Sequence, residues 1–465
     1  MPVYQPMILI LRLRKGNMKA FSFKSVSGMH PQISRVWKLS VPAILTQITT
    51  VAMQYIDSAM VGRLGANASA SIGLVSTTTW LMNGVSTAVV VGFSVQVAQH
   101  IGANEPLRAR LVIRHGLLSM LLISLLLMTI GIAISTPLPR WLGGDEVLWK
   151  DASAYFLTFA IAIPFMAMNR MAAGFLQSAG NMVVPSVLNA MMCLLDVVFN
   201  AIFIPKYGVL GAGIGTCLAI VVVSFAEMWF CCFRYEPLRI NRRESCPRDL
   251  GILKRALRIG APVAAESAAM CSAQVASTVI IAPLGPISMA AHALAITAES
   301  LCYMPGFGIA AAASTLVGQS IGAKDYPMAR RYGYITVAFG SAVMGLTGII
   351  MYLASPLVFQ MLTPVKEVQV VATQILRIGL IAEPLYGAAM VASGALRGAE
   401  DTLVPSFLNL FSMWAVRLGL ARFLVPQYGI HGMWIAMAIE LCFRGIIMLL
   451  RLIRSKYMRG PVRSI

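Results

Sequence analysis

The chain has 465 residues, of which 58% are apolar and only 12% are charged, and its formal net charge is +19. Soluble globular proteins carry about 25% charged residues, so this composition excludes an ordinary soluble enzyme and indicates a protein that crosses the membrane many times. The positive charge does not indicate a nucleic-acid partner, because the basic residues lie between apolar runs and form no single soluble face.

The first segment in chain order is a basic stretch, 1–36. Its apolar run, MILILRL, is short for a signal peptide, and no small-residue cleavage site follows it. We therefore expect 1–36 to be a cytoplasmic tail, with a start at Met18 or Met29 as a simple alternative.

Twelve apolar runs follow, each near or above the roughly 20 residues that cross a bilayer as a helix. We expect spans at 37–62, 70–101, 109–136, 150–179, 182–204, 209–233, 254–282, 287–321, 331–357, 367–396, 402–425 and 430–453. The fold class is therefore all-α, with twelve transmembrane helices. The predicted domains are a lobe at 37–233, a loop at 234–253, a second lobe at 254–457 and a tail at 458–465.

Basic residues indicate how the spans are oriented. The stretch 234–258 contains eight Lys and Arg residues, and both chain ends are also basic. The loops on the opposite side, such as 205–209 and 283–288, carry one or two basic residues at most. Cytoplasmic loops are enriched in Lys and Arg, so both termini and 234–258 are predicted to face the cytoplasm.

The two predicted lobes resemble each other at a constant spacing. QHIGAN at 99–104 matches QSIGAK at 319–324, and GFLQSAGNMVVPSVLN at 174–189 matches GALRGAEDTLVPSFLN at 394–409, with the same offset of 220 positions in both pairs. Since six is an even number of spans, a duplicated six-helix unit gives two parallel copies, related by an axis along the membrane normal. Repeats of this kind form transporters with a central cavity, although a duplicated scaffold without transport is the simpler alternative.

Asp57 is the most unusual residue of the first lobe. It is the only charged residue between Lys38 and Arg63. A carboxylate near the bilayer centre costs about 2.5–3.5 kcal/mol on insertion scales and is retained mainly where it binds an ion or a proton. The alternative is a structural Asp that is hydrogen-bonded to a neighbouring helix.

A second polar group lies in the fifth predicted span. Asp196 and Asn200 are one helical turn apart and share a face, with Asn189 and Asn169 as further sources of oxygen. Carboxylate and amide oxygens suit Na⁺, and the carboxylate suits a proton equally well. Asp57, Asp196, Asn200 and Asn189 are therefore the predicted coupling residues, the first three as a possible Na⁺ site, with interhelical hydrogen bonding as the alternative.

Acids also occur in the second lobe, at positions that differ from those of the first. Glu266 follows Pro262 by four residues in a stretch with no other charge, Glu299 is similar, and Glu383 precedes a proline. The acids do not recur at the offset of the repeat, which indicates different chemistry in the two lobes. The predicted substrate-binding residues are Glu266, Glu299, Glu383, Gln47 and Asn169. For Arg417 we expect a structural role beside a nearby acid or a helix-end carbonyl.

Several long motifs resemble the bacterial multidrug and toxic compound extrusion (MATE) family. They are IDSAMVGRLG at 56–65, PVAAE at 262–266, the stretch 304–331 and the stretch 393–437, so that the resemblance covers about 40–440. It implies two six-helix lobes, a bacterial inner-membrane location, and efflux of organic compounds driven by entry of Na⁺ or H⁺. It also implies an essential acid at Asp57.

Two departures from the family's pattern stand out. RGxGDT reads RGAEDT here, with Glu400 in place of Gly. In the fifth span, family members often carry an Asn followed four residues later by an Asp. Here Asp196 comes first and Asn200 second, so the same residue types occur in the opposite order.

The expected activity is therefore a cation-coupled antiporter that exports small, cationic, amphipathic compounds. No nucleotide-binding or metalloprotease motif is present, so we expect no enzyme activity and no cofactor other than Na⁺ or H⁺. Lipid and small organic substrates are the expected partners, and the expected functional unit is a monomer. A flippase for lipid-linked or amphipathic substrates is the main alternative, although flippases more often use Arg and Lys to bind phosphates. A channel or a receptor is a weaker alternative.

Overall fold

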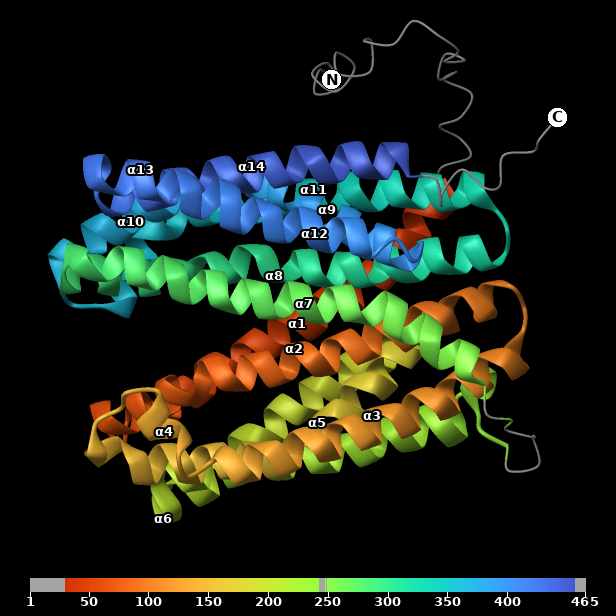
Figure 1. Cartoon of the computed structure of the whole chain (residues 1–465), viewed down its shortest axis with the longest axis horizontal. Helices are drawn as coiled ribbons and strands as arrows, with labels where there is room; N and C mark the ends of the chain where they lie inside the picture. Colours follow the sequence, from red (N-terminus) through yellow and green to blue (C-terminus); the bar gives the residue numbers. More distant parts are fainter. Residues whose placement is uncertain (1–29, 242–246, 248, 456–465) are drawn as a thin grey trace, which may run out of the picture.

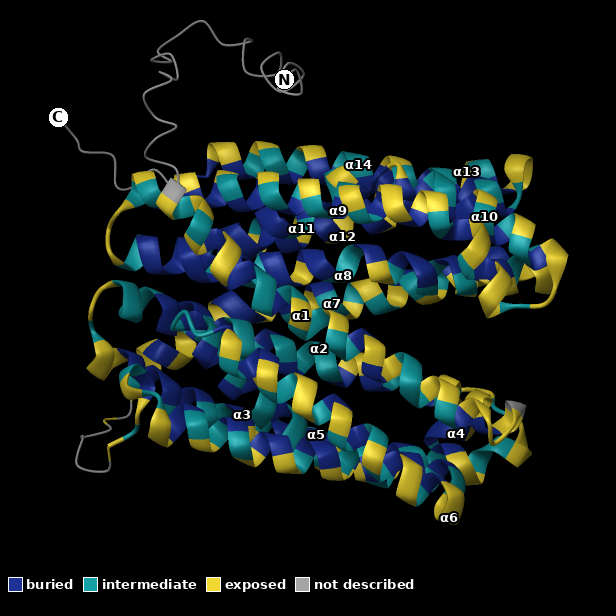
Figure 2. Ribbon diagram, turned by 180° about the vertical axis from the view of Figure 1, so that it is seen from behind, coloured by how far each residue is buried: buried dark blue, intermediate teal, exposed yellow. Residues whose placement is uncertain are grey.

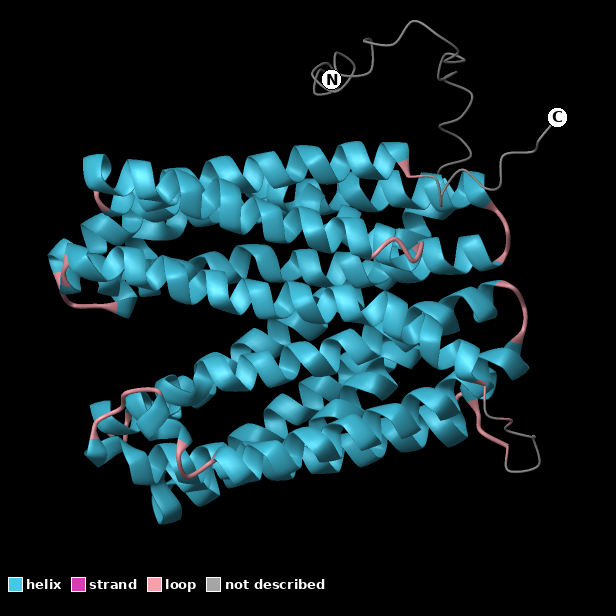
Figure 3. Ribbon diagram, in the orientation of Figure 1, coloured by secondary structure: helices cyan, strands magenta, loops and turns pink. Residues whose placement is uncertain are grey.

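The computed structural model describes residues 30–241, 247 and 249–455 of the chain. Most of the predicted N-terminal tail, part of the inter-lobe loop and the C-terminal tail lie outside these described residues. All regular elements of the described chain are helices, as Figure 3 shows. Helices satisfy their own backbone hydrogen bonds, which is what a chain needs in a bilayer that offers no water.

The N-terminal lobe contains five long helices and three short elements. They are α1 (His30–Gly62), α2 (Ala66–Gly102), α3 (Pro106–Ile134), α4 (Leu138–Trp141), α5 (Glu146–Ser178), α6 (Val183–Trp229), the π-helical turn η3 (Phe230–Arg234) and the 3-10 turn η4 (Glu236–Leu238). α6 is interrupted at Gly208, whose φ of 59° and ψ of −131° are not helical. Its second half folds back on the first, since a Cβ at Gly211 would lie 2.2 Å from the carbonyl oxygen of Phe203. α6 therefore supplies two spans.

The C-terminal lobe has the same plan with more interruptions. Its elements are α7 (Leu250–Ile281), η5 (Ala282–Leu284), α8 (Pro286–Gly322), α9 (Tyr326–Leu362), α10 (Lys366–Leu380), α11 (Glu383–Gly398), α12 (Leu403–Phe411), η6 (Ser412–Arg417), α13 (Leu418–Tyr428) and α14 (Ile430–Arg454). α10 and α11 form one span with a bend of 54°. The π-helical η6 joins α12 and α13 into another span.

These elements account for the twelve predicted spans. Ten helices of the described chain are long and apolar enough to cross a membrane, and the bent pair α10–α11 forms an eleventh. α6 counts once among the ten but folds back at Gly208, so its two halves bring the total to twelve. The chain is thus a multi-pass membrane protein.

The backbone itself repeats between the lobes. Nearly every residue with positive φ has a counterpart 220 or 221 positions away: Gly65 with Gly285, Asn104 with Lys324, Gly180 with Glu400, and Gly208 with Gly429. Such residues set the turns between helices, because few side chains tolerate this conformation. The internal repeat predicted from sequence is therefore present in the turns as well as in the helices.

Beyond shifts of a few residues at helix ends, three features differ from the sequence-based prediction. α1 begins at His30, so the first helix includes the end of the predicted 1–36 tail. The short α4 has no counterpart in the prediction, and the span predicted at 367–396 is broken before Glu383. Pro384 explains this break, because proline lacks an N–H and is favoured in the first turn of a new helix, where α11 has it.

The lobes lie side by side along α1, α2, α7 and α8. Figure 1 shows α2 to α6 in one group and α8 to α14 in the other, with α1 and α7 passing between them. The two groups lie close together at the end with the α2–α3 turn and diverge at the other end. The helices also expose large apolar side chains: Leu118, Leu122 and Leu126 on α3 are 58–60% exposed and one turn apart. Figure 2 shows exposed residues recurring along the helices, as expected for surfaces that contact lipid.

Candidate cation site in the N-terminal lobe

Two carboxylates and one amide meet between α1 and α6. The Nδ2 atom of Asn200 donates to Oδ1 of Asp57 at 2.9 Å and to Oδ2 of Asp196 at 3.2 Å. Asp196 and Asn200 are fully buried, while Asp57 is half-buried. The structure therefore brings together the three residues for which the sequence predicted a shared site.

Two acceptor oxygens of this group have no hydrogen-bond partner in the described chain. They are Oδ1 of Asp196 and Oδ1 of Asn200, and both are buried. An unpaired buried polar atom costs about 1–3 kcal/mol, so these oxygens are suited to a bound cation or to a proton on a carboxylate. No described residue forms a salt bridge with Asp57 or Asp196. The described chain also holds no cluster of three or more His, Cys, Asp or Glu side chains that is suited to a metal ion. A Na⁺ ion would therefore need amide or carbonyl oxygens beside the two carboxylates.

The fold-back of α6 closes the site from one side. A Cβ at Gly215 would lie 2.2 Å from Oδ1 of Asn200, so only glycine allows the second half of α6 to approach this closely. The GAGIG stretch at 211–215 is typical of a close helix contact, and its last glycine lies directly against the site.

Gly215→Ala should therefore displace Asn200 and weaken the bridge that its amide forms between Asp57 and Asp196. Inserting a methyl group into a packed site costs about 1–3 kcal/mol when the neighbours must shift. We expect reduced thermal stability together with reduced export. Gly73→Ala is the matched control, because nothing lies within 4 Å of a Cβ at Gly73. Equal behaviour of the two variants would show that Asn200 does not depend on this packing.

The other predicted amides lie apart from the carboxylates. Asn189 donates to the carbonyl oxygen of Thr46 at 3.0 Å and to Oγ1 of Thr50 at 3.1 Å, so it ties α6 to α1. Asn169 on α5 has a buried Oδ1 without a partner in the described chain, and Gln47 is half-buried on α1. Asn189 thus stabilises the helix pair that carries the site, and none of the three contacts Asp57 or Asp196 through a hydrogen bond.

Glu266, predicted as a substrate-binding residue, is occupied by protein partners. Its oxygens accept hydrogen bonds from Arg397 at 3.1 and 3.2 Å, from Oγ of Ser406 at 2.7 Å and from Nδ2 of Asn409 at 2.6 Å. Both oxygens are satisfied, so this arrangement supports a structural role that links α7, α11 and α12.

Glu299 and Glu383 form a different kind of pair. Both are buried, they lie close enough to interact electrostatically, and both oxygens of Glu383 lack a partner in the described chain. The rings of Tyr303 and Tyr386 lie beside them, with centroids 5.9 Å apart. Glu383 stands at the first turn of α11, immediately after the bend. Of the acids in the second lobe, these two have the chemistry of a binding site.

Sequence reasoning missed Glu440, the partner of Arg417. Glu440 on α14 is fully buried and accepts hydrogen bonds from Arg417 at 2.7 Å, Arg444 at 2.5 Å and Ser412 at 2.5 Å. The structural role expected for Arg417 agrees with this geometry. The sequence signal was the Glu440–Arg444 pair, one helical turn apart in a mainly apolar span.

Glu227 on the second half of α6 was also missed. It is buried, with an unpartnered Oε1 in the described chain.

The two-lobe arrangement agrees with the family that the chain resembles. The profile of the MatE family matches 42–202 and, separately, 262–422. These two ranges cover most of the chain, and the offset between their starts, 42 and 262, is the spacing of the internal repeat. The chain belongs to the MatE family, whose members are transporters and not enzymes.

Curated relatives match over nearly the full length. The chain is 27% identical over 458 residues to "Probable multidrug resistance protein NorM" of Idiomarina loihiensis, covering 93% of this chain and 97% of the relative. It is also 27% identical over 431 residues to "Multidrug resistance protein NorM" of Burkholderia vietnamiensis, covering 88% and 91%.

Solved structures share the fold. One is a crystal structure of MATE in complex with MaL6, with a TM-score of 0.87, 22% identity and coverage of 92% of this chain and 97% of that one. Another, also with a TM-score of 0.87, is a MOP superfamily transporter from Pyrococcus furiosus with 20% identity, covering 92% and 96%. At these identities the likeness establishes the fold alone.

Proposed function

We propose that this chain is a secondary antiporter that exports small organic compounds in exchange for Na⁺ or H⁺. The observation that carries the proposal is the Asp57–Asn200–Asp196 group, two carboxylates held by one amide inside a membrane transporter. Its relatives are named multidrug resistance proteins, which supports a broad range of exported compounds.

The site can couple ion entry to export because α1 carries one carboxylate and α6 carries the other. A cation or proton that binds both would hold the helices together, and its release would let them separate. Coupling requires that the ion has different affinities for the two conformations. α1 also packs on α8 of the other lobe, so a change at Asp57 can reach the lobe interface.

The exported compound is proposed to be cationic and amphipathic. Glu299 and Glu383 supply buried carboxyl groups in the second lobe, and Tyr303 and Tyr386 supply aromatic faces that attract cations. These groups lie in a different lobe from Asp57 and Asp196, which separates substrate binding from ion binding.

A flippase remains the second candidate. Three Arg residues of the spans, Arg397, Arg417 and Arg444, are paired with acids, which leaves them poorly placed to bind a phosphate. Arg170 on α5 donates instead to a hydroxyl, Oγ1 of Thr87 at 3.4 Å, and it is the feature that favours an anionic group.

The proposal includes the setting in which the protein works. The inner membrane, cytoplasmic termini, a functional monomer and no cofactor besides the coupling ion fit the charge pattern and the family.

Export of ethidium from cells that lack their own efflux pumps tests this function. Cells expressing the protein should retain clearly less dye than cells with an empty vector. Collapsing the Na⁺ gradient and the H⁺ gradient separately identifies the coupling ion, because only one collapse should restore dye retention. Equal retention with and without the protein, for ethidium and a panel of other organic cations, would contradict the proposal. Movement of a fluorescent phospholipid between leaflets would support the flippase instead.

A further inference from the structure

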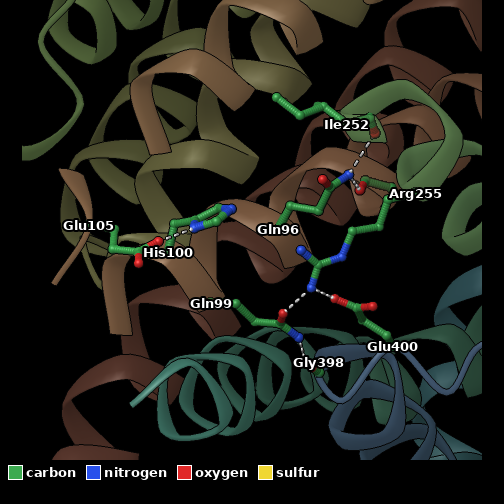
Figure 4. Close-up of polar contacts among 9 residues, drawn as sticks. Gln96, Gln99, His100, Glu105, Ile252, Arg255, Gly398 and Glu400 are labelled. Carbon is green, nitrogen blue, oxygen red and sulfur yellow. Dashed lines mark hydrogen bonds and ion pairs between the residues drawn. The ribbon is translucent and has the colours of Figure 1, made fainter. Parts of the chain in front are cut away.

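The lobes are joined at one end by two equivalent glutamines. Gln99 on α2 donates through Nε2 to the carbonyl oxygen of Gly398 at 3.3 Å, across the lobe boundary (Figure 4). Gln319 on α8 donates through Nε2 to the carbonyl oxygen of Ser178 at 2.8 Å, across the same boundary in the opposite sense. Gln99 is equivalent to Gln319 in the internal repeat, and Gly398 is equivalent to Ser178. The two hydrogen bonds are therefore copies of one contact.

Each glutamine also accepts a hydrogen bond from an arginine of the other lobe. Arg255 on α7 donates to Oε1 of Gln99 at 2.5 Å, and Arg35 on α1 donates to Oε1 of Gln319 at 3.1 Å. Arg35 and Arg255 are again equivalent positions of the repeat. Each amide therefore bridges the lobes through both its oxygen and its nitrogen, and the whole relay is present twice.

The backbones at this end are in close contact. A Cβ at Gly102 would lie 1.9 Å from the carbonyl oxygen of Gln319, and a Cβ at Gly322 would lie 1.9 Å from that of Gln99. α2 and α8 thus touch at two glycines that are equivalent in the repeat. The end of the protein that carries the α2–α3 turn is closed in this structure.

One residue breaks the symmetry of the relay. Glu400 forms a salt bridge with Arg255 (Figure 4), whereas the position equivalent to Glu400 in the first lobe is Gly180. Both positions have positive φ, 61° at Glu400 and 88° at Gly180. A glutamate is strained in this conformation and glycine is not, so the chain carries an unfavourable residue where its own repeat carries the favourable one.

We propose that Glu400 is a positioning residue that holds Arg255 against Gln99 and so stabilises the closed end of the lobe interface. The arginine side chain is long and flexible. Because the Glu400 carboxylate already holds Arg255 in place, Arg255 loses less conformational entropy when it contacts Gln99 of the other lobe. Arg35 has a glycine at the equivalent position, so the Gln319 relay lacks the salt bridge that Glu400 adds to the Gln99 relay. The salt bridge is 39% and 24% exposed on its two sides, so salt weakens it.

This inference rests on the proposed function only in treating the closed end as a gate. The distance between the lobes can be measured without any substrate or ion gradient. Failure of transport and failure of this inference are therefore separate results.

Electron paramagnetic resonance distances across this end test the proposal in the full-length protein. Spin labels attached to genetically encoded keto amino acids at Leu107 and Leu403, exposed residues of α3 and α12, leave the native cysteines untouched. Glu400→Gln and Glu400→Gly should each raise the population with a longer distance about threefold, the size of change that a partly exposed ion pair supports. Raising salt in the unmodified protein should shift the distances in the same direction.

Glu105→Gln is the matched control. Glu105 lies at the same end but pairs with residues of its own lobe, with His100 (Figure 4) and with Arg108. This variant should therefore keep the distances of the unmodified protein.

Thermal unfolding distinguishes opening of the lobe interface from a local change in backbone strain at residue 400. Glu400→Gly relieves the backbone strain and should unfold at a higher temperature than Glu400→Gln, although both open the gate to a similar extent. If both variants keep the distance distribution of the unmodified protein, Glu400 does not hold the interface and the proposal is wrong, whatever their unfolding temperatures.

Discussion

Asp57→Asn should strongly reduce ion-driven export. The amide keeps the shape of the side chain but can neither carry the negative charge nor accept a proton as a carboxylate does. Coupling free energies between sites are typically about 1–3 kcal/mol, so we expect export to fall by about tenfold or more. Ethidium efflux, measured at equal amounts of protein in the membrane, provides the test.

Asp151→Asn is the control for this prediction, because Asp151 is an exposed acid on α5. It should export at the level of the unmodified protein. Full export by Asp57→Asn would assign Asp57 a structural role and leave Asp196 to act alone.

Glu440→Gln should strongly destabilise the second lobe. The substitution leaves Arg417 and Arg444 buried without the carboxylate that both contact. Removing one partner of a buried ion pair typically costs about 3–5 kcal/mol, because the remaining charge stays unpaired in a low dielectric. Thermal unfolding of the purified protein should show a clear loss of stability.

Glu367→Gln provides the comparison, since Glu367 is an exposed acid at the start of α10. This variant should unfold at the same temperature as the unmodified protein. If Glu440→Gln does so as well, the Arg417–Glu440–Arg444 contacts contribute no net stability.

The spans, the repeat and the members of the first-lobe site could be predicted from sequence for simple physical reasons. Hydropathy is a local property, and a duplicated unit repeats at a fixed offset, as 99–104 and 319–324 do. Asp57 stood out because an acid is costly in an apolar span. Asp196 and Asn200 were grouped because residues four apart on a helix share a face.

Pairing between helices could not be predicted in the same way. Glu266 reads as a lone acid, yet its partner Arg397 is 131 residues away. Arg417 and Glu440 are brought together by the π-helical η6, which composition does not reveal. The relay between Gln99 and Arg255 crosses from one lobe to the other and depends on how the lobes pack.

Transport by the purified protein in liposomes tests the central claim most directly. A gradient of Na⁺ or of H⁺ would be imposed separately, with ethidium at equal concentration on both sides. We predict that one of the two gradients drives ethidium against its own concentration gradient, and that Asp57→Asn removes this uphill movement. Ethidium that never moves uphill under either gradient, while crossing the membrane downhill through the protein, would contradict ion-coupled antiport.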